Sequence, residues 1–132
     1  MYLIDSDILV DFCRGKIAPQ ENINRVGLSN CVVSEISLAE MLVGAYKSGN
    51  ESEFLRVEKM EKMFAPIPLS YEIIDHYAQL RASLETRGMR IANMDLFIAA
   101  TAIANDFTLV THNTSHFSRI PGLRLEDWTE EA

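Results

Sequence analysis

The sequence predicts an α/β fold in which a central parallel sheet of four to five short strands is covered by helices on both faces. Short apolar runs alternate along the chain with longer segments of helical periodicity. Strands separated by helices pair in parallel, and a parallel sheet has to be buried on both faces. The 132 residues are 48% hydrophobic, enough for a sizeable core, so we expect one domain over residues 1–132.

The first strand is expected at residues 2–4, where an apolar run stops at a polar cluster. Gly15 ends the short helix that follows, and Pro19 precedes another. Ser34 is a candidate N-cap between a β-branched run and a long helical segment that Gly49 breaks. In this half of the chain we therefore predict helices over 8–13, 19–27 and 35–47 and a second strand over 31–33.

In the second half, Pro66 and Pro68 end a helix of mixed charge, and Ile67 between them is a candidate for a minor strand. Ser70 opens a long amphipathic helix for which Gly88 is a fitting C-cap. The stretch "DLFIAATAIA" is apolar on nearly all sides, so its helix should be buried. The predicted elements are helices over 51–64, 70–87 and 95–104, a strand over 107–111 and an edge strand over 123–128.

The formal net charge of −7 argues, taken alone, against nucleic acid as a partner, because phosphate binding usually leaves a basic footprint. A bound metal ion would change that potential locally, so the charge does not exclude such a partner. We find no signal peptide, and no apolar run approaches the about 20 residues that span a bilayer. Cys13 and Cys31 form no CxxC pair and are expected to be small buried residues. We therefore expect a cytoplasmic protein without a membrane segment.

Asp5 follows the first strand in "YLIDSDILV", where two carboxylates lie between two apolar runs. Sites in open parallel sheets form beyond the carboxyl ends of the strands, and the polar residues 111–113 follow another strand. Taken alone, an N-cap outweighs a functional role for Asp5. Asp5, Ser6 and Asp7 nevertheless offer three caps where one suffices, which leaves a side chain free to point into a site.

Glu40 lies in the helix predicted over 35–47. The helical period places it with Ile36, Val43 and Tyr46 on one apolar side that should face inward. Burying an unpaired carboxylate costs several kcal/mol. No basic residue lies one turn before it, but a salt bridge from elsewhere in the fold is an alternative, and we weight the structural and functional interpretations evenly.

Asp95 begins the most apolar helix of the chain, where an N-cap is the simplest interpretation. Asn93 can take that role as well, which would free Asp95. Asp5, Glu40 and Asp95 together suggest one acidic pocket, in which like charges repel unless a cation intervenes. Hard divalent cations such as Mg²⁺ bind oxygen ligands, activate water and orient phosphate, so the chemistry predicted for this pocket is metal-assisted hydrolysis.

His112 and His116 in "HNTSH" form a rival constellation, since two histidines at i and i+4 of a helix can hold zinc. No Glu lies between them, no Cys is nearby, and Asn, Thr and Ser are poor helix formers, so we do not expect a zinc site. The chain also has no GxSxG, P-loop or GxGxxG motif, which weakens the serine hydrolase, NTPase and dinucleotide-binding interpretations.

Four stretches follow one another along the chain: "YLIDSDILVDF", "SEISLAEMLVGA", "MDLFIAATAIANDFTLVTHN" and "HFSRIPGLRLEDW". Their order and spacing resemble the PIN-domain family and, within it, the VapC-like toxins of bacterial toxin–antitoxin pairs. Asp5, Glu40 and Asp95 match the acidic triad of that family. Ser6 stands where the family often has Thr, so its hydroxyl is expected to support the site, and Asn113 matches the family's Asn after the fourth core strand.

The resemblance implies a PIN-like three-layer fold and a Mg²⁺- or Mn²⁺-dependent endoribonuclease whose products carry a 5′-phosphate and a 3′-hydroxyl. Asp5 and Asp95 would hold the metal directly, and Glu40 would ligate it or bind one of its waters. The resemblance also implies a homodimer and a cognate antitoxin whose C-terminal segment enters the active site. Five basic residues are candidate contacts to the RNA substrate: Arg14, Lys16, Lys47, Arg87 and Arg90. Each of them can also be interpreted as ordinary surface charge.

His116 stands where many family members have a further acidic residue. We therefore do not expect a full site of four carboxylates, and His116 is expected to contact phosphate or the antitoxin instead. The same departure motivates an alternative of a different class, a catalytically weakened PIN-like binding module that acts through protein or RNA interaction. Titration with a divalent ion separates the two hypotheses, because only the enzyme needs to bind the metal.

Overall fold

The computed structural model describes residues 1–130 and contains a five-stranded parallel sheet in the order β3-β2-β1-β4-β5. Its strands are β1 (Tyr2–Ile4), β2 (Cys31–Ser34), β3 (Ala65–Ile67), β4 (Thr108–Val110) and β5 (Leu125–Glu126). Strand β1 is central, and Leu3 lies between Val32 of β2 and Leu109 of β4. The residue that follows β1 is therefore held in the middle of the carboxyl edge of the sheet.

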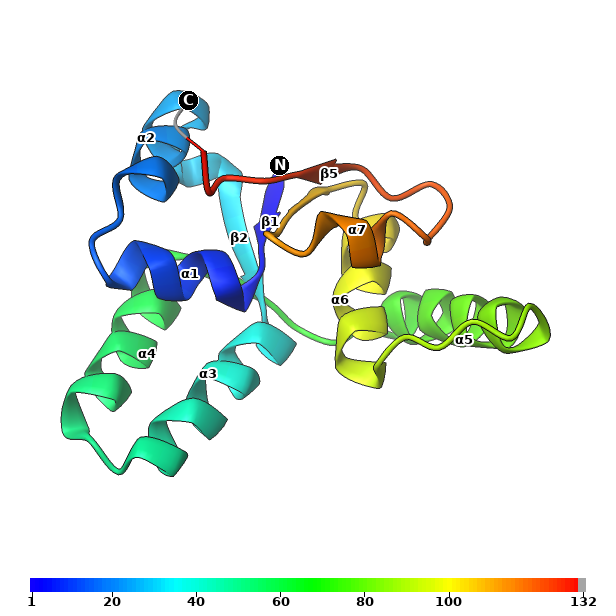
Figure 1. The fold of residues 1–132 in the computed structure, drawn as a ribbon, viewed down its shortest axis with the longest axis horizontal. Helices are drawn as coiled ribbons and strands as arrows, with labels where there is room; N and C mark the ends of the chain where they lie inside the picture. The colour runs from blue at the N-terminus through cyan, green and yellow to red at the C-terminus, as the bar shows by residue number, and fades with distance from the viewer. Residues whose placement is uncertain (131–132) are drawn as a thin grey trace.

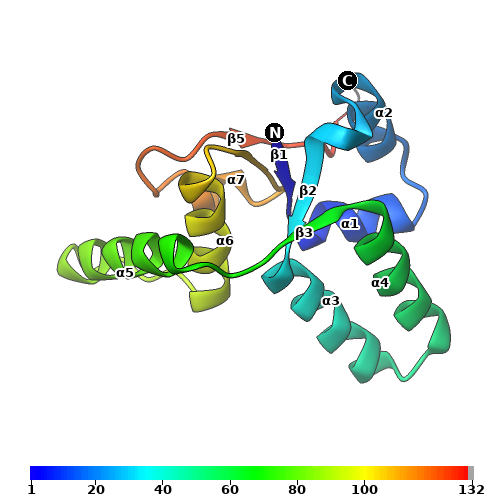
Figure 2. The same ribbon diagram turned by 180° about the vertical axis from the view of Figure 1, so that it is seen from behind.

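The helices divide into two groups on opposite sides of the strands (Figure 1). Their bounds are α1 (Ser6–Cys13), α2 (Ile17–Val26), the 3₁₀ turn η1 (Leu28–Asn30), α3 (Glu35–Ser48), α4 (Glu51–Met63), α5 (Tyr71–Thr86), α6 (Asn93–Ala104) and α7 (Thr114–Phe117). Helices α1 to α4 lie on one side and α5 to α7 on the other, and the view from behind shows the same division (Figure 2). This three-layer arrangement confirms the predicted fold class.

Each face of the sheet has its own core, because successive side chains of a strand point to opposite faces. Leu3, Val32 and Leu109 are buried with residues of α5, α6 and α7. Ile4 and Val110, one position further along their strands, are buried with residues of α1, α2 and α4. Burial on both faces explains why these strands read as continuous apolar runs rather than as alternating ones.

Most of the predicted helix boundaries agree with the structure because the capping residues behave as expected. The Ser34 hydroxyl accepts a hydrogen bond from the backbone N–H of Ser37 at 3.0 Å, and Ser70 accepts one from Ile73 at 3.2 Å. Gly49 ends α3 with φ +63°, a left-handed conformation that glycine adopts without strain. The predicted edge strand over 123–128 is present but is shorter, since only Leu125–Glu126 pairs with β4.

Two helix predictions are corrected. The stretch "TSHF" forms helix α7, although its composition disfavours a helix. The Asn113 carbonyl accepts hydrogen bonds from the N–H groups of His116 and Phe117, and the Phe117 ring is 1% exposed in the core, so tertiary packing stabilises this turn. Helix α2 starts at Ile17 rather than after Pro19, because a proline in the first helical turn loses no intrahelical hydrogen bond.

The inward-facing stripe predicted for α3 is wrong. Val43 is 53% exposed and Tyr46 is 75% exposed, whereas Ser37 and Ala45 form the buried side of the helix. Figure 1 shows the reason: α3 and α4 form a hairpin that extends beyond the sheet, so no other element of residues 1–130 covers the outer side of α3. Glu40 is therefore half-buried near the base of this hairpin rather than enclosed in an apolar core.

Two expectations from composition concern cysteines and membranes. Cys31 is buried as predicted, but Cys13 is only half-buried, and both thiols are free. No helix within residues 1–130 has the length and apolar character needed to cross a bilayer. With both thiols free, noncovalent packing carries the stability of the described fold.

Trp128 anchors the C-terminal segment to the sheet. Its ring is 1% exposed, lies 5.4 Å from the Tyr2 ring between centroids, and belongs to the core on the α1 side. Its Nε1–H donates a hydrogen bond to Glu126 Oε1 at 3.0 Å. This anchor also holds the neighbouring residues Asp127 and Thr129 close to the loop that follows β4.

Replacing Trp128 by Ala should lower the free energy of unfolding by about 3–5 kcal/mol, because a fully buried aromatic ring leaves a large cavity. Urea denaturation followed by circular dichroism measures this loss. Ile17→Ala is the matched control, since Ile17 is 63% exposed and its truncation should change the unfolding free energy by less than about 1 kcal/mol. Equal effects of the two substitutions would contradict the assigned core.

Candidate functional site

Asp5 follows the central strand β1 and is the N-cap residue of α1. Its backbone N–H donates to the Val110 carbonyl at 2.9 Å, which fixes it beside the end of β4. Its Oδ1 accepts from the backbone N–H of Ser6 at 2.8 Å, and its Oδ2 accepts from the Thr111 hydroxyl at 2.9 Å. The residue is only 7% exposed. Asp5 is thus both a helix cap and a buried carboxylate at the carboxyl edge of the sheet.

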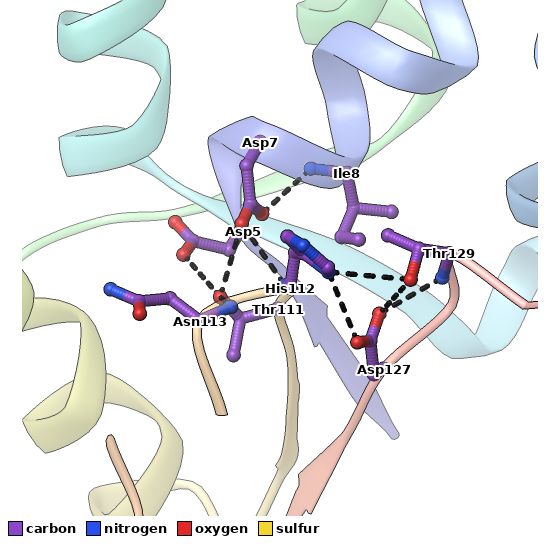
Figure 3. Close-up of polar contacts among 8 residues, drawn as sticks. All are labelled: Asp5, Asp7, Ile8, Thr111, His112, Asn113, Asp127 and Thr129. Atoms are coloured by element: carbon purple, nitrogen blue, oxygen red, sulfur yellow. Dashed lines mark hydrogen bonds and ion pairs between the residues drawn. The ribbon is translucent and has the colours of Figure 1, made fainter. Parts of the chain in front are cut away.

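Thr111 connects the two aspartates of the N-terminal motif (Figure 3). Its fully buried hydroxyl lies 2.9 Å from Asp5 Oδ2 and 3.4 Å from Asp7 Oδ2. The same Asp7 oxygen accepts from the backbone N–H of His112 at 3.0 Å, so Asp7 ties α1 to the loop after β4. The sequence placed Thr111 among the polar residues that follow a strand at the same edge as Asp5, but it assigned Thr111 no role of its own.

Burial raises the pKa of three carboxyl groups in this region, and repulsion from neighbouring carboxylates adds to the effect in two of them. Burial, followed by the charges of Asp7 and Glu40, raises the pKa of Asp5 to about 7, despite the hydrogen bonds that it accepts. Burial raises the pKa of Asp7. Burial and the charges of Asp95 and Asp7 raise the pKa of Glu40. The three predicted carboxylates, Asp5, Glu40 and Asp95, are therefore electrostatically coupled through Glu40, and they come from the start of α1, from α3 and from α6.

Asp95 lies in the first turn of α6, but it does not cap the helix. The N-cap position is Ala92, and the Asn93 amide oxygen accepts hydrogen bonds from side chains of α5. Asp95 Oδ2 instead lies 3.1 Å from Nε2 of His116 in α7. The N-cap interpretation is thus wrong for both Asn93 and Asp95, and the Asp95 carboxylate faces α7.

The three predicted supporting residues lie in different environments. Ser6 donates its backbone N–H to Asp5 and lines the groove beside α1. Asn113 is exposed at the start of α7, and its side chain points to the same side of the strand ends as the Asp5 carboxylate (Figure 3). His116 contacts the third carboxylate, Asp95.

His112 and His116 do not share a site. The Nδ1 atom of His112 lies 3.1 Å from Asp127 Oδ2 and 3.3 Å from the Thr129 hydroxyl (Figure 3). His116 instead contacts Asp95. Burial opposes ionisation of Asp127, but hydrogen bonds from Thr129 and His112 outweigh it and lower the pKa of Asp127. The zinc interpretation that we rejected from the sequence therefore finds no support in this geometry.

The acidic group has the donor chemistry that suits a hard divalent cation. Within residues 1–130, no group of three or more His, Cys, Asp or Glu side chains is arranged to hold a metal ion directly. Mg²⁺ commonly keeps several waters and binds through only one or two carboxylates. Asp5, which is buried beside like charges and has a raised pKa, fits this mode, because a cation would relieve both burial and repulsion.

A groove of about 640 Å³ starts at the acidic group and runs between α1, α3 and α4. Ser6, Asp7 and Glu40 line it together with Arg14 and Arg56 of the surrounding helices. The groove therefore offers both carboxylates and guanidinium groups to a bound chain.

The fold and this acidic edge define an α/β protein with a site at the carboxyl end of a parallel sheet. A model of the PIN domain matches residues 2–123. The ribonuclease VapC2 of Rickettsia felis is 34% identical, with 97% of this chain and 98% of the relative covered. The tRNA(fMet)-specific endonuclease VapC of Salmonella typhimurium is 30% identical, with 96% and 97% covered. The chain belongs to the PIN-domain family, among its VapC-like members.

Solved structures show the same relationship. DNA-bound VapBC from Salmonella typhimurium matches with a TM-score of 0.89 and 29% identity, over 96% of this chain and 97% of that one. VapBC2 from Rickettsia felis, bound to a DNA fragment from its promoter, matches with a TM-score of 0.86 and 34% identity, over 96% and 98%. A toxin–antitoxin complex from Klebsiella pneumoniae matches with a TM-score of 0.73 and 28% identity, over 93% and 95%.

The raised pKa of Asp5 predicts a pH-dependent stability in metal-free protein. The folded state favours the protonated carboxyl, so this contribution is fully present below the ordinary value of 3.8 and is lost as the pH rises through about 7. Asp5→Asn removes the titration and should make metal-free protein more stable than wild type by roughly 2–4 kcal/mol at about pH 8.

Chemical denaturation in the presence of a chelator, repeated across the pH range, measures this difference. The advantage of Asp5→Asn should shrink towards zero below about pH 3, where the wild-type carboxyl is protonated in both the folded and the unfolded state. If Asp5→Asn were instead destabilised by the same amount at every pH, the prediction would be contradicted. Asp5 would then be ionised in the fold, with hydrogen bonds that offset the cost of burying its charge.

Proposed function

We propose that this chain is a Mg²⁺- or Mn²⁺-dependent endoribonuclease that hydrolyses RNA phosphodiester bonds, and the toxin of a toxin–antitoxin pair acting in the cytoplasm. The observation that carries the proposal is the convergence of Asp5, Glu40 and Asp95 from three separate elements into one coupled acidic group. The relatives named as ribonucleases and as a tRNA(fMet)-specific endonuclease support RNA as the substrate.

The residues of the acidic group have distinct roles in this proposal. Asp5 and Asp95 would hold the ion, and Glu40 would ligate it or bind one of its waters. A bound Mg²⁺ supplies an activated water and neutralises charge on the scissile phosphate. Thr111 holds the Asp5 carboxylate in place, and a bound cation would favour the ionised form of Asp5, whose pKa burial raises to about 7.

Substitution of either proposed metal ligand should abolish cleavage. Asp5→Asn and Asp95→Asn keep the size of the side chain but remove its charge, and each should slow cleavage of structured RNA by at least about 100-fold in the presence of Mg²⁺. The assay uses chain purified free of antitoxin. Asp75→Asn on the exposed surface of α5 is the matched control and should cleave at the wild-type rate.

Two results would contradict the metal mechanism. One is wild-type activity in the Asp5→Asn or Asp95→Asn variant. The other is a folded wild-type chain that neither binds Mg²⁺ nor cleaves RNA, which would favour the catalytically weakened binding module. A thermal-shift series gives an independent readout, since Mg²⁺ at ten times its Kd should stabilise wild type by about 1.4 kcal/mol.

A cognate antitoxin is the protein partner that we propose. The match to the toxin–antitoxin complex from Klebsiella pneumoniae supports this partner. The groove between α1, α3 and α4 leads to Glu40, and the apolar side chains of Val43 and Tyr46 are exposed on α3. An antitoxin segment that lies in this groove would cover the acidic group and exclude RNA.

We also propose that the chain forms a homodimer through α5. Tyr71 and Ile74 lie one turn apart on this helix and are 82% and 42% exposed. Antitoxin-free protein should elute with twice the mass of one chain in size-exclusion chromatography with light scattering, and Tyr71→Asp with Ile74→Asp should convert it to monomer. Leu55→Asp, on the exposed side of α4, is the control that should leave the dimer intact. Disruption by Leu55→Asp alone would place the interface on α4.

A further inference from the structure

His116 lies between the third carboxylate of the site and an arginine. Its Nε2 is 3.1 Å from Asp95 Oδ2, and both side chains are about three-quarters buried, with 24% and 28% of their surfaces exposed. Its Nδ1 is 2.9 Å from a terminal nitrogen of Arg119. Both ring nitrogens of His116 are therefore engaged within the fold.

Arg119 is itself fixed by the backbone on two sides. Its Nε donates to the His116 carbonyl at 3.2 Å, and its terminal nitrogen also donates to the Arg90 carbonyl at 3.1 Å. Arg90 belongs to the loop that leads into α6, the helix whose first turn contains Asp95. Arg119 thus links the end of α7, the His116 ring and the entry to α6.

These contacts determine where the imidazole proton lies. A guanidinium group has only donors, so Nδ1 of His116 must accept the hydrogen bond from Arg119. An imidazole that accepts at Nδ1 carries its proton on Nε2, where it can donate to the Asp95 carboxylate. The opposite tautomer would place two donors against each other at Nδ1 and an unprotonated nitrogen against the carboxylate.

We propose that His116, held in its Nε2–H form by Arg119, is a positioning residue that orients Asp95 for a divalent cation. The N–H group donates to Oδ2 of Asp95, which fixes the carboxylate and leaves Oδ1 without a contact to His116. Neither ring nitrogen of His116 has a lone pair left for the metal, which excludes His116 as a ligand in this arrangement. The inference rests on the proposed function for the identity of the ion.

In this arrangement His116 supports a carboxylate of the acidic group without itself being a metal ligand. A metal-binding carboxylate that accepts a hydrogen bond from a second residue keeps a fixed orientation, and loss of such a partner typically costs 10- to 100-fold in metal affinity. The helix α7 supplies this partner, and the burial of Phe117 in the core holds α7 in place.

The tautomer can be measured directly in the wild-type chain. Long-range ¹H–¹⁵N correlation spectra resolve the ring nitrogens of histidines, and this chain has only three, of which His76 and His112 are assigned by single substitution. We expect His116 to show a protonated Nε2 and an unprotonated Nδ1. Arg119→Leu removes the donor at Nδ1 and should allow the Nδ1–H tautomer to appear. A wild-type His116 ring with its proton on Nδ1 would overturn the proposal.

A matched pair of variants tests the consequence for the metal. His116→Phe keeps a ring of similar shape but has no donor, whereas His116→Gln keeps an N–H donor near the Nε2 position. Mn²⁺ binding to antitoxin-free chain, followed by electron paramagnetic resonance, should weaken at least about 10-fold in His116→Phe and by less than about 3-fold in His116→Gln. His76→Phe on α5 is the control and should bind Mn²⁺ as wild type does.

The outcomes separate this proposal from the proposed function. Wild-type Mn²⁺ affinity in His116→Phe would overturn the positioning role and leave the metal site intact. A wild-type chain that binds no Mn²⁺ would overturn both the positioning role and the proposed function, since Asp95 would then bind no ion. Circular dichroism of each variant shows whether it folds, and the tautomer measurement on wild type is independent of any variant.

Discussion

The hydrogen bond from the buried Thr111 hydroxyl to Asp5 is the contact on which the rest of the site depends. The register of β1 and β4 pairs Ile4 with Val110, so the next residue of each strand emerges at the same place. A carboxylate buried there without partners would cost several kcal/mol. Thr111 and the N–H of Ser6 reduce that cost but do not remove it, as the raised pKa of Asp5 shows. The residual instability is what a cation would relieve.

The distribution of charge matters more in this protein than its total. The net charge is −7, and several of the carboxylates are concentrated in the coupled group at the sheet edge. Among the described residues, Lys16, Arg25 and Arg124 are in ion pairs with carboxylates. Arg81 and Arg119 instead donate to carbonyl oxygens of the loop before α6. Those two arginines place positive charge at the loop that leads into α6, a position that the net charge alone does not reveal.

The two sides of the sheet contribute differently to the site. The α1 side supplies Asp5, Asp7 and a groove whose walls belong to α1, α3 and α4. The other side supplies Asp95 on the buried helix α6 and orients it through α7. The buried helix α6 and the short helix α7, which the buried Phe117 ring holds in place, therefore set the direction in which Asp95 points. Sites placed on such elements keep their geometry better than sites on loops alone.

The sequence by itself determined the fold class, most helix ends, the family and the identity of the three carboxylates as candidates. It could do so because apolar periodicity, capping residues such as Ser34 and Ser70, and the order of the motifs are local properties. Only the tertiary structure decided which side of α3 is buried, because the α3–α4 hairpin extends beyond the sheet and leaves Tyr46 uncovered. It alone showed that Thr111 joins Asp5 to Asp7 and that His116 faces Asp95, because those contacts join residues far apart in the chain and depend on strand register and on the packing of Phe117.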